Sequence, residues 1–337
     1  KIMQQEKEWI KYPVIRLDMS GAGTTAQQLT SFFEDSFEEY EKKYGIITPP
    51  KSLSKRFKNI IMTAREQSGQ KVAVLVDEYD SPLQHSWQTP QHEECTEVYR
   101  TVFAVLKEAD EYEKFVFITG ITKFTQISLF SVLNNLTNQS FNPQWATVSG
   151  ITEEEIKENF MPELEGMAHD NGWTLPETHN KLKNYYDGYH FSKGNMTDIY
   201  NPFSLIKALS SGNIQNFWAS SGATTLLPKF VDHMELRLKD FESCPIMPLT
   251  LETSDVTGGG PELFLYQSGY LTIKSSDEFG YILGFPNEEV KQALYELVIP
   301  ALTMRKDQEP STLQAALIRQ LGLCQLPNAM KSLKALI

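Results

Sequence analysis

The chain has 337 residues, of which 41% are hydrophobic and 22% are charged, and its formal net charge is −12. These values are ordinary for a soluble globular protein, and the length is sufficient for two or three domains. The acidic balance argues against a nucleic-acid grip spread over the whole chain, because phosphate binding needs many Lys and Arg contacts. A local basic patch stays compatible with it.

The cysteine content and the hydropathy predict where in the cell the chain is located. Three cysteines, far apart in the sequence, predict a reducing cytoplasm. No run of about 18 apolar residues is present, so we expect no membrane span. The amino-terminal segment is rich in Lys and Gln without an apolar core, which is unlike a signal peptide. It starts without Met and in a predicted helix, so we expect a fragment of a longer chain.

The first predicted elements alternate between helix and strand. They are a helix over residues 1–10, a strand over 12–20, a helix from Thr24 or Thr25 to about residue 44, and a helix over 53–67. Gly21 and Gly23 follow the first strand, but the remaining Gly and the Lys of a phosphate loop are missing. We therefore interpret this glycine pair as a flexible turn between strand and helix.

Residues 71–80 form the most informative stretch, because an unbroken apolar run ends in three acids. Such a run predicts a strand buried on both faces, as in a parallel sheet covered by helices. Asp77, Glu78 and Asp80 would then lie at the carboxyl edge of the sheet, where ligands bind. This pattern is typical of a Walker B strand, in which Asp77 would hold magnesium and Glu78 would polarise an attacking water. Asp80 would support the metal shell or the turn.

A simpler interpretation of the acids is helix capping. Acidic residues often follow a strand to cap the next helix, and Ser81 followed by Pro82 has the form of such a start. Beyond it, residues 84–94 are polar and read as a mobile surface loop. His85, His92 and Cys95 lack the fourth ligand and the Cys-x-x-Cys pair of a zinc site.

A second buried strand is predicted over residues 114–123, after an amphipathic helix over 96–110. Thr119, Thr122 and Lys123 would emerge at the same edge as Asp77, or would serve only as turn residues. A further short strand is expected over residues 146–151, before a helix whose start at Thr152 has a capping-box pattern. The alternation of strands and helices predicts an α/β fold with a parallel sheet and right-handed crossovers.

The character of the chain changes after residue 151. We expect an α/β core over residues 1–151, a helical subdomain over 152–240, a winged-helix-like α+β unit over 241–310 and a helical tail over 311–337. The aromatic turn at residues 186–191 either stacks a base or, as we favour, fills the core of the helical subdomain. The winged-helix-like unit consists of a helix over 262–270, a hairpin over 270–285 and a helix over 288–302. It has few Lys and Arg, so packing or partner docking is favoured over DNA binding.

Several motifs together resemble those of the bacterial AAA-ATPase-like domain family. They are Val76–Leu83, Ile118–Phe124, Leu133–Leu136, Tyr186–Phe191, Tyr200–Phe203 and Phe264–Thr272. The resemblance implies a partial RecA/AAA-type parallel sheet that uses ATP and Mg²⁺, with Thr119 or Lys123 sensing the γ-phosphate. It also implies an upstream phosphate loop and, often, a nuclease-like domain of the PD-(D/E)XK type in the same full-length chain.

The sequence departs from that pattern in two places. Gly-x-x-x-x-Gly-Lys-[Ser/Thr] is absent, and Gly69-Gln70-Lys71 precedes a strand where a phosphate loop would follow one. Glu289-Val290-Lys291 has a nuclease-like spacing but lies in a predicted helix without an upstream strand Asp, so we reject it. The phosphate-loop strand is central in RecA/AAA sheets, so another segment or chain would have to fill its place.

These observations predict the core of an AAA-like ATPase that is inactive without its phosphate loop. The alternative is a non-catalytic module of the same fold that binds protein or nucleic acid. A third hypothesis is a subunit for defence or mobile-element processing that acts through a nuclease partner. A homo-oligomer is compatible with each of them.

Overall fold

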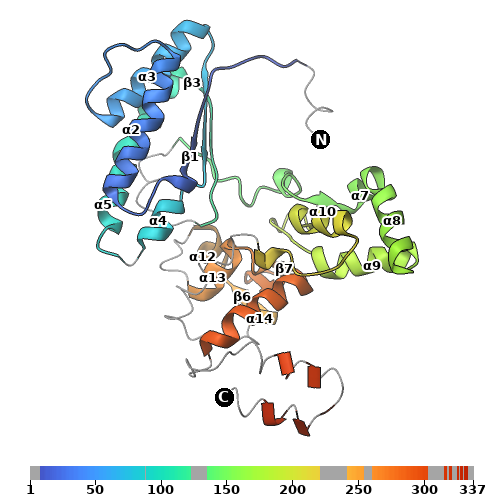
Figure 1. Cartoon of the computed structure of the whole chain (residues 1–337). Coiled ribbons are helices and arrows are strands. Elements are labelled where there is room, and N and C mark those ends of the chain that lie inside the picture. Colours follow the sequence, from blue (N-terminus) through green and yellow to red (C-terminus); the bar gives the residue numbers. More distant parts are fainter. Residues whose placement is uncertain are drawn as a thin grey trace. The chain divides into compact units, whose positions relative to one another are not determined.

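The computed structural model describes residues 8–87, 89–122, 135–220, 241–253 and 260–302, together with a few short stretches between residues 315 and 332. The chain divides into two compact units (Figure 1). Unit 1 comprises Lys1–Asn138 with Thr253–Gly258, and unit 2 comprises Gln139–Glu252 with Gly259–Ile337. Within the described residues, no helix is long and apolar enough to cross a membrane.

A three-stranded parallel sheet forms the centre of unit 1. Its strands are β1 (Val14–Asp18), β2 (Val72–Asp77) and β3 (Glu113–Ile118), in the order β1-β2-β3. Three of the four strands predicted for a parallel α/β sheet are found here. The central strand is β2, which pairs directly with β3 through partners such as Val76 and Ile118. This pairing satisfies backbone groups of β2 that would be costly to bury alone.

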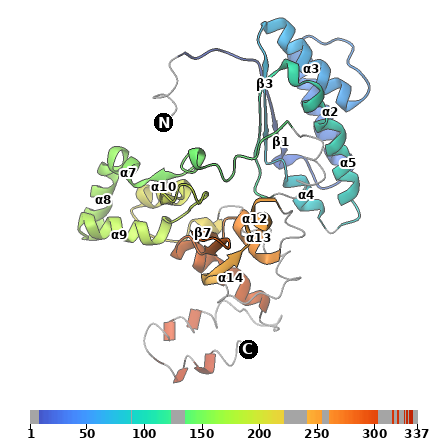
Figure 2. The same ribbon diagram turned by 180° about the vertical axis from the view of Figure 1, so that it is seen from behind.

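Three amphipathic helices pack together on one side of this sheet, as both views show (Figures 1 and 2). They are α2 (Ala26–Lys43), α3 (Leu53–Ser68) and α5 (His92–Phe103). The Thr25 side chain caps α2 by accepting from the Gln28 N–H, and Gly69 ends α3 in a left-handed conformation with φ 66°. The core between the helices is aromatic, and the Phe37 and Phe57 rings stack at 5.1 Å. The helices α2 and α3 confirm the sequence-based expectations.

Among the described residues of unit 1, the opposite face of the sheet is only partly covered, so the prediction that β2 is buried on both faces is wrong. Burial alternates along β2, where Val72, Val74 and Val76 are buried and the intervening residues are only half-buried. On β3 the rings of Phe115 and Phe117 are exposed and stack on each other at 5.8 Å. The continuous apolar run misled the prediction, since the half-buried positions carry apolar residues too.

Short helices connect β2 to β3. They are α4 (Ser81–Ser86), α6 (Val105–Glu108) and the 3-10 turn η2 (Asp110–Tyr112). The expected loop over residues 84–94 lies partly within α4 and α5, because Gln84 and Ser86 are buried against neighbouring turns. The N-cap of α4 is Asp80, one residue before the predicted Ser81. The expected helix over residues 96–110 is interrupted at Ala104.

The first part of unit 2 is helical. Its elements are the short strand β4 (Ile151–Thr152), the helices α7 (Glu153–Asn159), α8 (Met161–Asn171) and α9 (Leu175–Tyr186), the strand β5 (Ile199–Tyr200) and the helix α10 (Pro202–Ser211). A capping box begins α7, as the sequence indicates, and the structure shows a second one at the start of α9 and an Asn201 cap on α10. The expected strand over 146–151 is wrong, because β4 begins only at Ile151 and pairs antiparallel with β5.

A small antiparallel sheet with three helices completes unit 2. The elements are β6 (Cys244–Ile246), α12 (Pro248–Thr253), α13 (Gly260–Gln267), β7 (Thr272–Ser276), β8 (Tyr281–Gly284) and α14 (Glu288–Leu302). The predicted hairpin and its flanking helices are confirmed, and β6 adds a third strand in the order β6-β8-β7. The winged-helix comparison stays a prediction. Most of the predicted tail helix, and residues 221–240 of the expected helical subdomain, lie outside the described residues.

Candidate functional site

The three strands of unit 1 deliver polar side chains to one edge. β1 ends at Asp18, β2 ends at Asp77, and Thr119 follows the last residue of β3. Asp18 and Asp77 are direct neighbours in the parallel register. Since the strands are parallel, all three side chains lie at the carboxyl edge of the sheet, where ligands of α/β sheets bind. The sequence predicted this meeting for Asp77 and Thr119.

Asp77 is held between two donors. The Thr119 hydroxyl donates to Asp77 Oδ1 over 2.7 Å, and Arg16 Nη2 lies 3.2 Å from Asp77 Oδ2. The same guanidinium nitrogen lies 3.3 Å from Asp18 Oδ2, so Arg16 bridges the two carboxylates. Hydrogen bonds from Ser20 hold the pKa of Asp18 below its usual value, with a smaller contribution from Arg16. About half of each carboxylate side chain is exposed, which leaves the edge accessible.

Glu78 has an unusual backbone. Its φ of 48° is the only positive value at a non-glycine position within the described ranges. Such a conformation is uncommon for this residue type, and strain of this kind concentrates at functional sites. Two backbone hydrogen bonds enforce it, one from Thr119 N to Val76 O and one from Tyr79 N to Thr119 O. Burial raises the pKa of the Glu78 carboxyl, and the charges of Asp18, Asp77 and Asp80 raise it further.

The side chain of Asp80 points towards Ile121 and Thr122, which follow β3. Its carboxylate accepts hydrogen bonds from the Ile121 N–H at 3.2 Å, from the Thr122 N–H and hydroxyl, and from the Gln84 amide. The residue is 1% exposed. Burial raises the pKa of its carboxyl, and the hydrogen bonds from Thr122 and Ile121 offset part of this rise. Gly120 is required beside it, because a Cβ there would lie 2.4 Å from Asp80 Oδ1. Of the two roles considered for Asp80, this geometry favours the turn over the metal shell.

The donor set at this edge suits a hard cation. Magnesium is usually held by one or two carboxylates together with waters and substrate phosphates, and Asp77 offers half-exposed carboxylate oxygens beside a hydroxyl. Within the described part of the chain, no group of three or more His, Cys, Asp or Glu side chains is arranged to hold a metal ion by itself. A cation at Asp77 would therefore need further ligands besides these side chains.

Two residues of this site were missed by sequence reasoning. Asp18 ends an alternating strand, as Asp77 ends its own strand. This similarity was the available sequence signal for placing Asp18 at the same edge. Arg16 lies two residues earlier on the same face of β1, which places its guanidinium beside both acids. Lys123, the other predicted sensor, lies outside the described residues. The glycine pair forms a turn into α2, where the Gln28 side chain accepts from the Thr24 N–H at 2.9 Å.

Comparisons with known proteins match most of the chain to a relative and its first 130 residues to a family model. A protein of Azotobacter chroococcum mcd 1, described as "Uncharacterized protein in vnfD 5'region", is 29% identical over 318 residues, which is 93% of this chain and 58% of the relative. The chain thus spans 58% of that relative's length. No solved structure matches the chain. Residues 1–130, which include the whole carboxyl edge of the sheet, match the family model described as "Predicted AAA-ATPase".

Proposed function

We propose that unit 1 is the nucleotide-hydrolysing core of an AAA-like ATPase. In this proposal Asp77 holds the magnesium ion of the nucleotide, Glu78 orients and activates the attacking water, and Thr119 contacts the γ-phosphate. The bound magnesium ion would supply positive charge that neutralises the phosphates. Asp80 joins the segment that follows β2 to Ile121 and Thr122, which follow β3, so that Glu78 and Thr119 stay at the same edge of the sheet.

One observation carries this proposal. The Thr119 hydroxyl lies 2.7 Å from Asp77 Oδ1 across neighbouring strands, directly beside the strained Glu78. An acid, a second acid and a hydroxyl at the carboxyl edge of a parallel sheet form the arrangement that phosphoryl transfer needs from this side of a nucleotide. The match of residues 1–130 to a predicted ATPase family supports the same assignment.

The proposal also requires a phosphate-binding segment. The 337 residues contain no Gly-x-x-x-x-Gly-Lys-[Ser/Thr] motif, so the backbone N–H groups and the Lys that cradle phosphates must be contributed in addition to these residues. The test therefore uses the longest natural chain that contains this sequence, with turnover measured by phosphate release and binding measured with a fluorescent ATP analogue.

Glu78→Gln is the decisive variant. Loss of the general base should reduce turnover about 100-fold or more while nucleotide binding is retained. Glu66→Gln is the matched control, because Glu66 is exposed on α3 in the same unit and should leave turnover unchanged. Unchanged turnover in Glu78→Gln would remove Glu78 from the mechanism.

A second candidate function is a binding module without catalysis. Arg16 favours it, since its guanidinium already pairs with Asp77 and neutralises the carboxylate that would hold magnesium. In that case the natural chain binds no nucleotide, and the Glu78→Gln and wild-type proteins behave alike. A nuclease-like domain, a nucleic acid or a second copy of the chain would then be the partner to seek. Salt-dependent DNA binding would single out the nucleic acid.

A further inference from the structure

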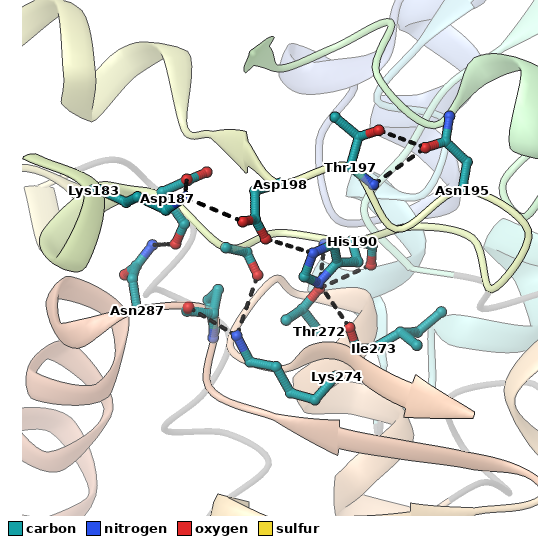
Figure 3. A network of polar contacts seen from close by, with 12 residues as sticks. Lys183, Asp187, His190, Asn195, Thr197, Asp198, Thr272, Ile273, Lys274 and Asn287 are labelled. Atoms are coloured by element: carbon teal, nitrogen blue, oxygen red, sulfur yellow. Dashed lines mark hydrogen bonds and ion pairs between the residues drawn. The ribbon is translucent and has the colours of Figure 1, made fainter. Parts of the chain in front are cut away.

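A depression of about 580 Å³ lies within unit 2, at the turn that follows α9. Its walls come from the end of α9, the turn at Asp187 and Gly188, the strand β7 and the start of α14 (Figure 3). This turn belongs to the aromatic motif of residues 186–191, which the proposed ATPase function does not use. We call this depression the Asp187 pocket.

The carboxylate of Asp187 is buried without a hydrogen bond of good geometry, although the neighbouring Gly188 N–H lies close enough to lower its pKa. The residue is 3% exposed, and neither carboxylate oxygen has a hydrogen-bond partner among the described residues. The nearest cation is Lys183, whose Nζ lies 3.9 Å from Oδ2. Leaving a buried carboxylate in this state is costly, because its lost hydration is not replaced.

The cations of the pocket are engaged elsewhere. Lys274 Nζ donates to the carbonyl oxygens of Gly188 at 3.3 Å and Pro286 at 3.0 Å. Lys183 lies 3.5 Å from Asp198, and Lys291 lies 2.9 Å from Glu242. What the pocket lacks is therefore a donor for Asp187. The pocket lining carries three lysines against four acidic residues, namely Asp187, Asp198, Glu242 and Glu288, which is a formal balance of −1.

The turn that presents Asp187 is rigid. Gly188 has φ 98°, and a Cβ there would lie 2.5 Å from the Pro286 carbonyl oxygen, so only glycine fits. The Asn287 amide donates to the Asp187 carbonyl oxygen at 3.1 Å, which fixes the backbone from the other side. His190 anchors the next residues by contacting the Ile273 carbonyl oxygen at 2.9 Å (Figure 3). The carboxylate is thus held in place before any ligand arrives.

We propose that the Asp187 pocket binds an organic cation, an alkylammonium or guanidinium group, with the Asp187 carboxylate as its counter-ion. Such a group supplies the missing hydrogen bonds and the missing positive charge together. A metal ion fits less well, because no cluster of three or more His, Cys, Asp or Glu ligands exists in the described part of the chain. The group can belong to a Lys or Arg side chain of a peptide or to a free polyamine, and the test separates these sources.

Binding is measured by two-dimensional NMR at pH 8, with the amides of Gly188 and Lys274 as reporters. The probes are N-acetyl-lysine methylamide, N-acetyl-arginine methylamide and putrescine. We expect saturable binding of at least one probe, with the capped amino acids favoured if the natural source is a peptide and putrescine favoured if it is a polyamine. Binding of none of the three would overturn the proposal.

Asp187→Asn tests the counter-ion, and Asp170→Asn, at an exposed position of α8, is its control. Asp187→Asn should weaken binding at least tenfold, whereas Asp170→Asn should leave it unchanged. Without ligand, Asp187→Asn should be at least as resistant to urea as the wild type at pH 8, because a buried charge is removed. Destabilisation with unchanged binding would make Asp187 a structural residue and would overturn the proposal.

The pH dependence gives a second readout. Burial raises the pKa of Asp187 to about 6; the charges of Asp198 and Glu153 raise it, while the Gly188 N–H and Lys183 oppose the rise. The probes stay cationic throughout, so their binding should weaken as the pH falls through 6. At pH 5 only about one tenth of Asp187 is ionised, and affinity should fall about tenfold relative to pH 8. Equal affinity at both values would contradict the role of Asp187.

Discussion

The hydroxyl of Thr119 donates to Oδ1 of Asp77 over 2.7 Å, joining the carboxyl ends of β3 and β2. Forty-two positions separate the two residues in sequence, and the contact exists only because their strands are adjacent and parallel. The hydrogen bond fixes the rotamer of the carboxylate beside Glu78. Thr119 therefore positions Asp77 in addition to any contact of its own with a nucleotide.

Thr119→Val should lower ATP turnover of the natural chain. The substitution keeps the shape of the side chain and removes the donor to Asp77. Hydrogen bonds to charged groups contribute about 1.5–3 kcal/mol, so a ten- to hundredfold loss is expected. Thr119→Ser retains the hydroxyl and should stay within about threefold of the wild type. Equal loss in both variants, measured by phosphate release, would point to packing and not to the hydrogen bond.

Gly120→Ala should destabilise unit 1. The added Cβ would lie 2.4 Å from Asp80 Oδ1 and 2.6 Å from the ring of Tyr79, so the turn must shift. Overpacking of this kind costs about 1–3 kcal/mol. Gly21→Ala is the control, because nothing lies within 4 Å of its added Cβ. Hydrogen exchange of the β2 and β3 amides should rise for Gly120→Ala alone, and protection equal to the control would contradict the turn assigned to Asp80.

Arg56→Met should destabilise the packing of α2 against α3. The Arg56 guanidinium donates to both oxygens of Glu41 at 2.8 and 2.7 Å, and the Glu41 side chain is only 5% exposed. Removing one member of a buried pair leaves the other charge uncompensated and costs about 3 kcal/mol or more. Amides of α2 and α3 should exchange faster. Arg100→Met removes an exposed pair with Glu97 and should change stability by about 0.5 kcal/mol or less.

Glu113 should make unit 1 less stable as the pH rises. Burial raises its pKa to about 8 from 4.5, and Asp110 adds to the rise against Lys71. Between these two values the folded chain holds a proton that the unfolded chain has released, so the free energy of unfolding decreases with increasing pH. This contribution is fully present below pH 4.5 and is lost by pH 8.

The measurement for Glu113 is urea unfolding between pH 5 and 9, followed through hydrogen exchange in β3. Glu113→Gln should remove the decrease over this window and should be more stable than the wild type at pH 9. Glu39→Gln, at an exposed position of α2, should retain the wild-type profile. A wild-type stability that stays level across the window would show that Glu113 is ionised in the fold.

Sequence patterns predicted much of unit 1 and its edge. The alternation of strands and helices, the caps at Thr25 and Gly69 and the acids after β2 depend on neighbours along the chain, so they are visible in the sequence. The meeting of Asp77 with Thr119 followed from one further rule, that parallel strands share a carboxyl edge. The same kind of local signal located the capped start of α7 and the hairpin of β7 and β8 in unit 2.

Long-range pairing decided the rest, because the partner of a side chain is set by which elements pack together. The sequence alone did not indicate that Asp80 turns towards Thr122, that Arg16 bridges two acids, or that Phe115 and Phe117 of β3 are exposed. Nor did it show that Asp187 is buried without a donor, since that depends on a loop about 100 residues away at Asn287. Local sequence thus determined the elements and their ends, while tertiary packing determined which charges are satisfied and which remain available.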